Sequence, residues 1–275
     1  GGLSFIRITD NGGGIKKEEV KTAFLRHATS KIDSADDLFT VASLGFRGEA
    51  LASIAAVSQV EMITKVDRDL TGVRYVIEGG KEQQVEEIGA PSGTTIIVRN
   101  LFFHTPARRK FMKTPSTEGS YIAELINRLA LSRPDISFKF INNGQNKLYT
   151  SGNGNLKDII YNLYGKDITK NLIEINAQTE DFSLTGYIAK PYISKGNRTY
   201  ENYFINERYI KSSVITSAIE TAYQTFVMVH KYPFTTLKFN ITKELLDINV
   251  HPTKMELKIS NHQELYSFIV EQLRL

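Results

Sequence analysis

Apolar and polar residues alternate along the chain with two periods, which predict strands and helices in turn. Alternation at every second residue marks strands, and in the first half these are residues 4–9, 59–64, 72–78 and 94–99. Recurrence at helical spacing marks helices, and those predicted are residues 16–27, 48–57 and 118–132. A mixed α+β fold follows for this half.

The second half repeats this mixture after a polar, glycine-rich segment at residues 150–158. A hairpin is predicted at residues 137–149, just before that segment. The helices predicted beyond it are residues 156–164, 212–225 and 263–275. The strands are residues 172–175, 183–189, 202–205, 236–241 and 247–250. We therefore expect two α+β domains, residues 1–153 and 154–275.

Composition narrows the class of protein. The chain has 275 residues, 41% hydrophobic, with a formal net charge of +4 and no cysteine. It can build a core, and disulfides, thiolate metal sites and cysteine nucleophiles are excluded. No apolar run approaches a membrane span. We expect a protein of the cytoplasm without a membrane partner.

One basic stretch stands out against the modest net charge. Residues 99–117 carry five Lys or Arg and no acidic residue. Such a stretch suits contacts with phosphate, and a solvated basic loop explains it as well. The sequence leaves both open.

Two glycine-rich segments carry the candidate chemistry. They are DNGGGI at residues 10–15 and LGFRGEALASI at residues 44–54, each before a predicted helix. Glycine lets the backbone approach an anion, and a helix N-terminus presents unpaired N–H groups. Asp10, at a strand end, can accept a hydrogen bond from an amine such as that of adenine, although an ordinary Asp-Asn-Gly turn is the alternative. No Walker A string is present, so a nucleotide site would belong to another class.

Glu49 follows the second segment and has two interpretations. It is a candidate acid or base, and its place in the first turn of a helix also suits a partner of the helix dipole. A third piece, SGTTI at residues 92–96, is a short turn into a strand.

The order D-x-G-x-G, G-x-x-G-x-A and G-T resembles the Bergerat-fold (GHKL) ATPase superfamily of gyrase, ninety-kilodalton chaperones, histidine kinases and MutL. Four longer strings resemble the MutL family of DNA mismatch repair proteins: RHATSKI, LGFRGEALASI, LFFHTPARRKF and DINVHPTKMEL. They extend over essentially the whole chain. The resemblance implies a Bergerat α/β sandwich followed by a smaller ribosomal-protein-like βαβ domain.

The resemblance also implies an ATP site. Asp10 would read adenine beside Gly12 and Gly14, with Thr94 helping through a water. Lys254 would reach from the second domain toward the γ-phosphate, where a solvated surface lysine is the alternative. The segments that would order over and wrap the phosphates supply Thr29, Ser30, Lys31, Gly45, Phe46, Arg47, Gly48 and Glu49.

Members of this family act as ATP-gated dimeric clamps that couple mismatch recognition to later steps. The implied partners are double-stranded DNA, a MutS-type mismatch-recognition protein and a strand-discrimination nuclease or helicase. A homodimer, ATP with Mg²⁺ and a bacterial cytoplasmic location are implied as well. Arg208 and Lys211 are the candidate DNA contacts.

The chain departs from the family pattern in two respects. The family's catalytic glutamate and its Mg²⁺-binding asparagine lie on a helix before the strand at residues 4–9, so we assign no catalytic or metal residue here and expect that first helix to be lacking. The usual N-G-R turn is Asn206-Glu207-Arg208, which puts its positive φ in doubt. A non-catalytic DNA- or partner-binding module is therefore the alternative to an ATPase.

Overall fold

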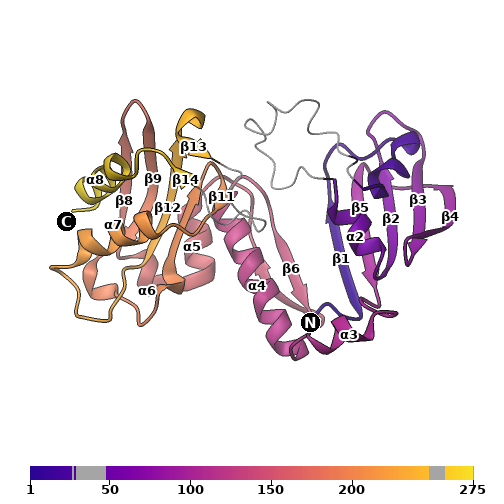
Figure 1. The fold of residues 1–275 in the computed structure, drawn as a ribbon, viewed down its shortest axis with the longest axis horizontal. Helices are drawn as coiled ribbons and strands as arrows, with labels where there is room; N and C mark the ends of the chain where they lie inside the picture. The colour runs from indigo at the N-terminus through magenta and orange to yellow at the C-terminus, as the bar shows by residue number, and fades with distance from the viewer. Residues whose placement is uncertain (27, 29–47, 248–257, 275) are drawn as a thin grey trace. The chain divides into compact units, whose positions relative to one another are not determined.

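The structure is a computed structural model that describes residues 1–26, 28, 48–247 and 258–274. It divides into two compact units, Gly1–Ile122 and Ala123–Leu275 (Figure 1). Both units contain helices and sheets, so the expected two-part α+β fold is confirmed. Among the described helices, no stretch has the length and hydropathy to cross a membrane.

The first unit is built on one five-stranded antiparallel sheet. Its strands are β1 (Phe5–Asp10), β2 (Gln59–Lys65), β3 (Gly72–Glu78), β4 (Lys81–Ile88) and β5 (Gly93–Arg99). Their order is β1-β5-β2-β3-β4, so β1 and β4 form the edges. Alternation in β2 buries Val60 and Met62 on one face, as the sequence predicts. Helix α2 (Ala50–Ala55) and two short 3₁₀ turns contribute to the core on that face.

One prediction for this unit is wrong, and one strand was missed. The helix expected at residues 16–27 is a pair of 3₁₀ turns, η1 (Lys17–Glu19) and η2 (Thr22–Phe24). Tertiary anchors override the helical pattern here, because Val20 and Phe24 are buried in the core while the residues between them stay largely exposed. Strand β4 was not expected, because its residues are polar and mostly exposed. It is an edge strand that is defined by its pairing with β3.

The other face of this sheet carries an ion-pair network. Glu61 accepts hydrogen bonds from Arg74 Nε at 2.6 Å and Arg99 Nη1 at 2.7 Å. These two guanidinium groups lower the pKa of the Glu61 carboxyl. One apolar and one polar face is the usual arrangement of an antiparallel sheet.

The basic stretch folds partly as a short helix, α3 (Pro106–Lys110), which has no buried residue. The longer helix α4 (Pro115–Ser132) follows, and the division between the units falls inside it. The sequence placed the domain boundary at 153/154 instead. The packing boundary comes earlier because Leu131 of α4 and Leu148 of the following hairpin share a core with Ile160 of the second unit. The assignment of separate roles to 1–153 and 154–275 stays a prediction.

A second five-stranded sheet forms the centre of the second unit. Its strands are β8 (Leu172–Gln178), β9 (Phe182–Ala189), β10 (Glu201–Ile205), β11 (Arg208–Tyr209) and β12 (Thr235–Ile241). The order is β11-β10-β12-β9-β8, with β10 parallel to β12 and the other pairs antiparallel.

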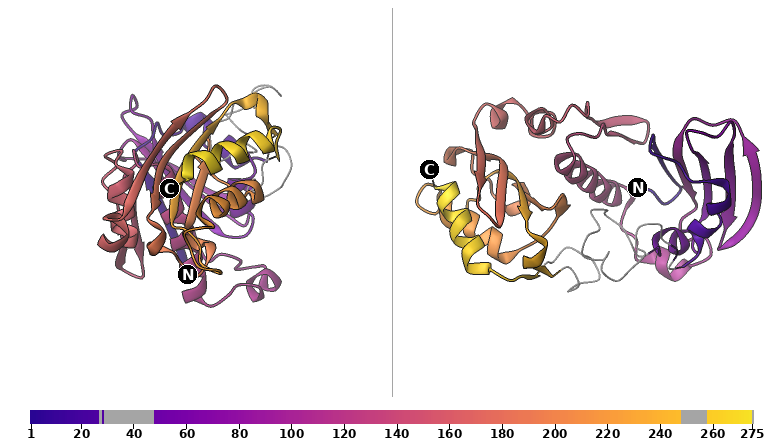
Figure 2. Two further views of the ribbon diagram at one scale, coloured as in Figure 1. Left: turned by 90° about the vertical axis from the view of Figure 1, so that its left-hand side faces the viewer. Right: turned by 90° about the horizontal axis from the view of Figure 1, so that it is seen from above.

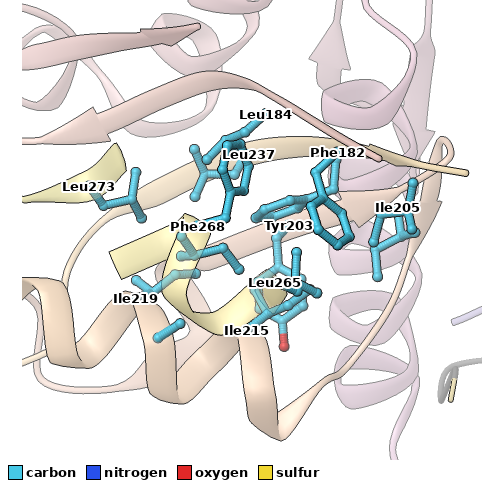
Figure 3. Close-up of a cluster of buried hydrophobic side chains, with 14 of the residues drawn as sticks. Phe182, Leu184, Tyr203, Ile205, Ile215, Ile219, Leu237, Leu265, Phe268 and Leu273 are labelled. Carbon is cyan, nitrogen blue, oxygen red and sulfur yellow. The ribbon is translucent and has the colours of Figure 1, made fainter. Parts of the chain in front are cut away.

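Helices pack on both faces of this second sheet (Figure 2). One face packs against α7 (Ser213–Tyr223) and α8 (His262–Leu273), with Leu184, Leu237 and Phe268 among the buried side chains (Figure 3). The opposite face packs against the end of α4 and the remaining small elements. These are α5 (Leu156–Tyr164), α6 (Lys166–Thr169) and the hairpin β6 (Lys139–Asn142) with β7 (Gln145–Tyr149).

Most elements of this unit were expected, and α5 has the predicted bounds. The short elements α6, β11 and β14 (Lys258–Ile259) were missed, because two to four residues carry no readable period. Strand β13 (Leu246–Asp247) overlaps the start of the strand predicted at residues 247–250. The rest of the strand predicted at residues 247–250 lies outside the described residues.

The doubtful turn does adopt left-handed backbone. Asn206 and Glu207 have φ values of 46° and 68°, and Ile205 pairs with Arg208 across them. The Asn206 side chain holds the turn, because its amide accepts from Ile241 N at 3.0 Å and donates to Ile241 O at 3.1 Å. Two positive φ values in a two-residue hairpin loop match the strand twist, so tertiary contacts replace the glycine.

A glycine in the centre of the second sheet generates a stability prediction. Gly186 has φ +128°, and a Cβ there would lie 2.2 Å from Thr236 O. We expect Gly186→Ala to lower the free energy of unfolding by about 2 kcal/mol or more, measured by urea denaturation with amide exchange in β9 and β12. Gly196→Ala is the control, since a Cβ there meets nothing within 4 Å. Equal stability of the two variants would contradict this account.

Candidate nucleotide site

Asp10 lies at the end of β1, where its carboxylate is held by the backbone. Its Oδ1 accepts hydrogen bonds from Gly12 N at 2.9 Å and from Thr94 N at 3.2 Å. Asp10 and Thr94 are also register partners in the β1–β5 ladder. The structure therefore brings together three residues that the sequence proposed for one site, although 84 positions separate Asp10 from Thr94.

Two glycines allow the chain to pack closely around this carboxylate. Gly14 has φ +71°, and a Cβ there would lie 2.1 Å from Lys65 O. Gly93 has φ +111°, and a Cβ there would lie 2.2 Å from Asp10 O. Backbone atoms occupy both positions, so a side chain would displace the strand ends themselves. The glycine requirement at these positions is thus steric as well as conformational.

Thr64 is a residue of this cluster that the sequence analysis missed. Its hydroxyl accepts from Ile15 N at 2.8 Å and lies 3.2 Å from Gly93 O and 3.0 Å from Thr94 Oγ1. It is 1% exposed. It therefore ties the loop after β1 to the turn before β5. The alternation in β2 is the one sign of it in the sequence. Thr64 lies on the same inward face as Val60 and Met62, which are apolar.

The second glycine segment is described only at its end. Gly48 has φ +61°, and a Cβ there would lie 2.1 Å from Ala28 O. Glu49 immediately precedes the first residue of α2. The remaining candidates lie outside the described residues: Thr29, Ser30, Lys31, Gly45, Phe46, Arg47 and Lys254.

The candidate DNA contacts lie together in the second unit. Arg208 is half-buried, and burial lowers the pKa of its guanidinium. Lys211 is exposed and directly precedes Ser212, the N-cap of α7, whose Oγ accepts from Ile215 N at 3.4 Å. Of the two, Lys211 is better placed to meet a phosphate in water.

In the part of the chain that the structure describes, no group of three or more His, Asp or Glu side chains is arranged to hold a metal ion.

The bonds of Thr64 generate the second prediction. Thr64→Val keeps the shape of the side chain and leaves Ile15 N without its acceptor. We expect a loss of about 1–3 kcal/mol in the free energy of unfolding and faster amide exchange at Ile15. Thr95→Val is the control, because Thr95 Oγ1 has its partner, Thr9 Oγ1, on the exposed side of the sheet. Unchanged exchange at Ile15 would show that Thr64 does not hold the loop.

The chain is similar to known DNA mismatch repair proteins. Residues 160–275 match the family described as DNA mismatch repair protein, C-terminal domain. The DNA mismatch repair protein MutL of Agathobacter rectalis is 62% identical over 266 residues, which cover 97% of the chain and 41% of that protein. The chain therefore spans less than half the length of this relative.

Solved structures share the fold of the chain. The crystal structure of the N-terminal domain of a DNA repair protein has a TM-score of 0.80 at 23% identity, over 99% of the chain and 84% of that structure. The Aquifex aeolicus MutL ATPase domain, complexed with ADP, has a TM-score of 0.65 at 25% identity, over 88% of the chain and 82% of that structure. The chain belongs to the MutL family of DNA mismatch repair proteins.

Proposed function

We propose that the first unit binds ATP at the cluster around Asp10. The observation that carries this proposal is the fixed carboxylate, whose Oδ1 takes two backbone N–H groups. Oδ2 takes neither of them, so it can accept from the amino group of adenine. Gly12 and Gly14 would lie beside the adenine ring, and Thr94 would add a water-mediated contact. The ADP bound to the related Aquifex ATPase domain supports a nucleotide here.

The phosphates would be held by the second glycine segment. Gly48 supports this role, because its backbone has the positive φ that a close turn before a helix needs. Lys254 would pair with the γ-phosphate and lose that partner after hydrolysis, which gives a switch. The other residues proposed for this cradle are Thr29, Ser30, Lys31, Gly45, Phe46, Arg47 and Glu49.

Hydrolysis needs Mg²⁺ and a general base, and we assign neither role to a residue of the chain. In the whole protein, ATP binding would dimerise these regions and close a clamp on DNA in the bacterial cytoplasm. Mismatch recognition by a MutS-type protein would thereby be coupled to a nuclease or helicase. A full-length protein that binds DNA and turns over no ATP would favour the alternative, a non-catalytic DNA- or partner-binding module.

The adenine contact generates the third prediction. In Asp10→Asn the amide oxygen can keep both backbone bonds, which places the amide NH₂ against the amino group of adenine. We expect ATP affinity to fall at least about tenfold, measured by isothermal titration calorimetry. Asp69→Asn, an exposed aspartate of the same unit, is the control. Wild-type ATP affinity in a folded Asp10→Asn variant would refute the site.

DNA contact is proposed at the start of α7. Lys211 is exposed there, and the N-terminus of this eleven-residue helix adds unpaired N–H groups and the positive end of its dipole. Arg208 is nearby in sequence and less accessible. Contacts of this kind are made to phosphate, so they depend on salt and weakly on base sequence.

The fourth prediction concerns the salt dependence of that contact. Lys211→Ala should weaken duplex binding and reduce the slope of log affinity against log salt by about one, measured by fluorescence anisotropy. Lys157→Ala removes the same charge from an exposed position in α5, a helix that packs on the opposite face of the sheet. This variant should leave the slope unchanged. Equal slopes for the two variants would exclude Lys211 from the interface.

A further inference from the structure

A pocket of about 790 Å³ opens in the second unit beside Lys211. Its wall is made by the start of α7, the strands β10 and β11, the later part of α4 and the beginning of α8. This volume lies in the range of small-molecule sites. A contact with a DNA backbone needs only a surface, so a cavity of this volume calls for another explanation.

Glu201, in β10, lines this pocket and is 5% exposed. Its Oε1 is buried and has no hydrogen-bond partner among the described residues. Buried carboxyl oxygens are normally paired, and one without a partner indicates a group that binds from outside the chain. Burial, aided by Glu220 and opposed by Arg198, raises the pKa of Glu201 to about 8. The carboxyl is therefore mostly neutral at pH 7 and offers one donor beside one acceptor.

One part of the pocket wall is suited to an anion. Lys211, Ser213 and Val214 all line it, and the last two are the first residues of α7. The N-cap Ser212 already supplies an acceptor to Ile215 N. The backbone N–H groups of the helix residues before Ile215 point out of the helix, where they suit a phosphate.

A planar group lies elsewhere in the wall. The guanidinium carbon of Arg128 is 4.2 Å from the ring centroid of Tyr209, and both residues line the pocket. Aromatic rings and guanidinium groups are surfaces on which nucleobases stack. The pocket thus combines an anion site, a flat surface and a buried donor–acceptor pair.

We propose that this pocket binds one nucleotide unit, with its phosphate at Lys211 and the start of α7 and its base edge paired with the Glu201 carboxyl. Every base edge presents a donor next to an acceptor, so the pocket reads the presence of a base more than its identity. The unit can come from a single-stranded DNA segment or from a free nucleotide. The inference goes beyond the proposed phosphate contact and shares Lys211 with it.

The test uses the whole chain with deoxyadenosine monophosphate, in the Asp10→Asn background so that the first unit does not compete. Binding is followed by chemical-shift changes at the Ser213 and Val214 amides. We expect Glu201→Leu to reduce the affinity about tenfold, to that of deoxyribose phosphate, which has no base. Glu201→Gln keeps a donor and an acceptor and should bind as wild type. Exposed Glu174→Gln on β8 is the matched control.

The pH profile separates this role from a structural one. From about pH 7 to about pH 9 the Glu201 carboxyl loses its donor, so wild-type affinity should fall while that of Glu201→Gln stays constant. The other charged groups near Glu201 or lining the pocket are Arg198, Glu220, Glu124, Arg128, Lys211 and His262. They are common to both proteins, so the difference between the profiles belongs to Glu201.

Two outcomes would overturn the inference. One is equal affinity for the nucleotide and for deoxyribose phosphate. The other is wild-type affinity for the nucleotide in a folded Glu201→Leu variant. If either occurred while duplex binding still depended on Lys211, the pocket would fail and the DNA proposal would stand. A short single-stranded oligonucleotide, compared with one that carries an abasic residue, shows whether the unit comes from DNA or from the free nucleotide.

Discussion

The candidate nucleotide site depends on one steric constraint, the contact between two strand ends without an intervening side chain. Gly93 lies against the carbonyl of Asp10 so closely that a Cβ would approach it to 2.2 Å. Because of that contact, the β1–β5 ladder extends to its last pair, Asp10 and Thr94. Thr94 N thereby reaches the Asp10 carboxylate. Once the carboxylate is held at Oδ1, its other oxygen has a fixed direction. The loop glycines and Thr64 then add to a geometry that the ladder has already set.

The sequence groups Asp10, Gly12 and Thr94 correctly because the segments that carry them are short and local. The D-x-G-x-G segment and the glycine-threonine turn can each be read alone, and the resemblance places them together. Thr64 could not be found in this way, because its role arises only when β2 pairs with β5 and its end contacts both segments. The same reason explains β4, whose polar residues show no period and which exists as a strand through its pairing with β3. The local alternation of apolar and polar residues does not reveal which strands pair at long range.

The turn at Asn206 and Glu207 shows the converse case, in which a local rule is overridden. Glutamate has no intrinsic preference for φ of 68°, and the sequence put the turn in doubt for that reason. The Asn206 amide makes two bonds to Ile241 and so fixes the loop from the neighbouring strand. Glu207 also lies 3.5 Å from Arg133 through its carboxylate. Contacts distant in sequence therefore decide the local backbone.

Glu201 departs from a different rule, because its buried carboxyl oxygen has no hydrogen-bond partner among the described residues. Burying a carboxyl disfavours its ionised form, and here the raised pKa means that folding becomes less favourable as pH rises from the ordinary value of 4.5 through about 8. An apolar residue at this position would carry no such cost, since the neighbouring β10 side chains Tyr203 and Ile205 are packed in a dense core. A residue that weakens the isolated fold is best understood through a bound state. The pocket beside α7 supplies that state, because a ligand's donor and acceptor would satisfy the carboxyl that the protein leaves unpaired among its described residues.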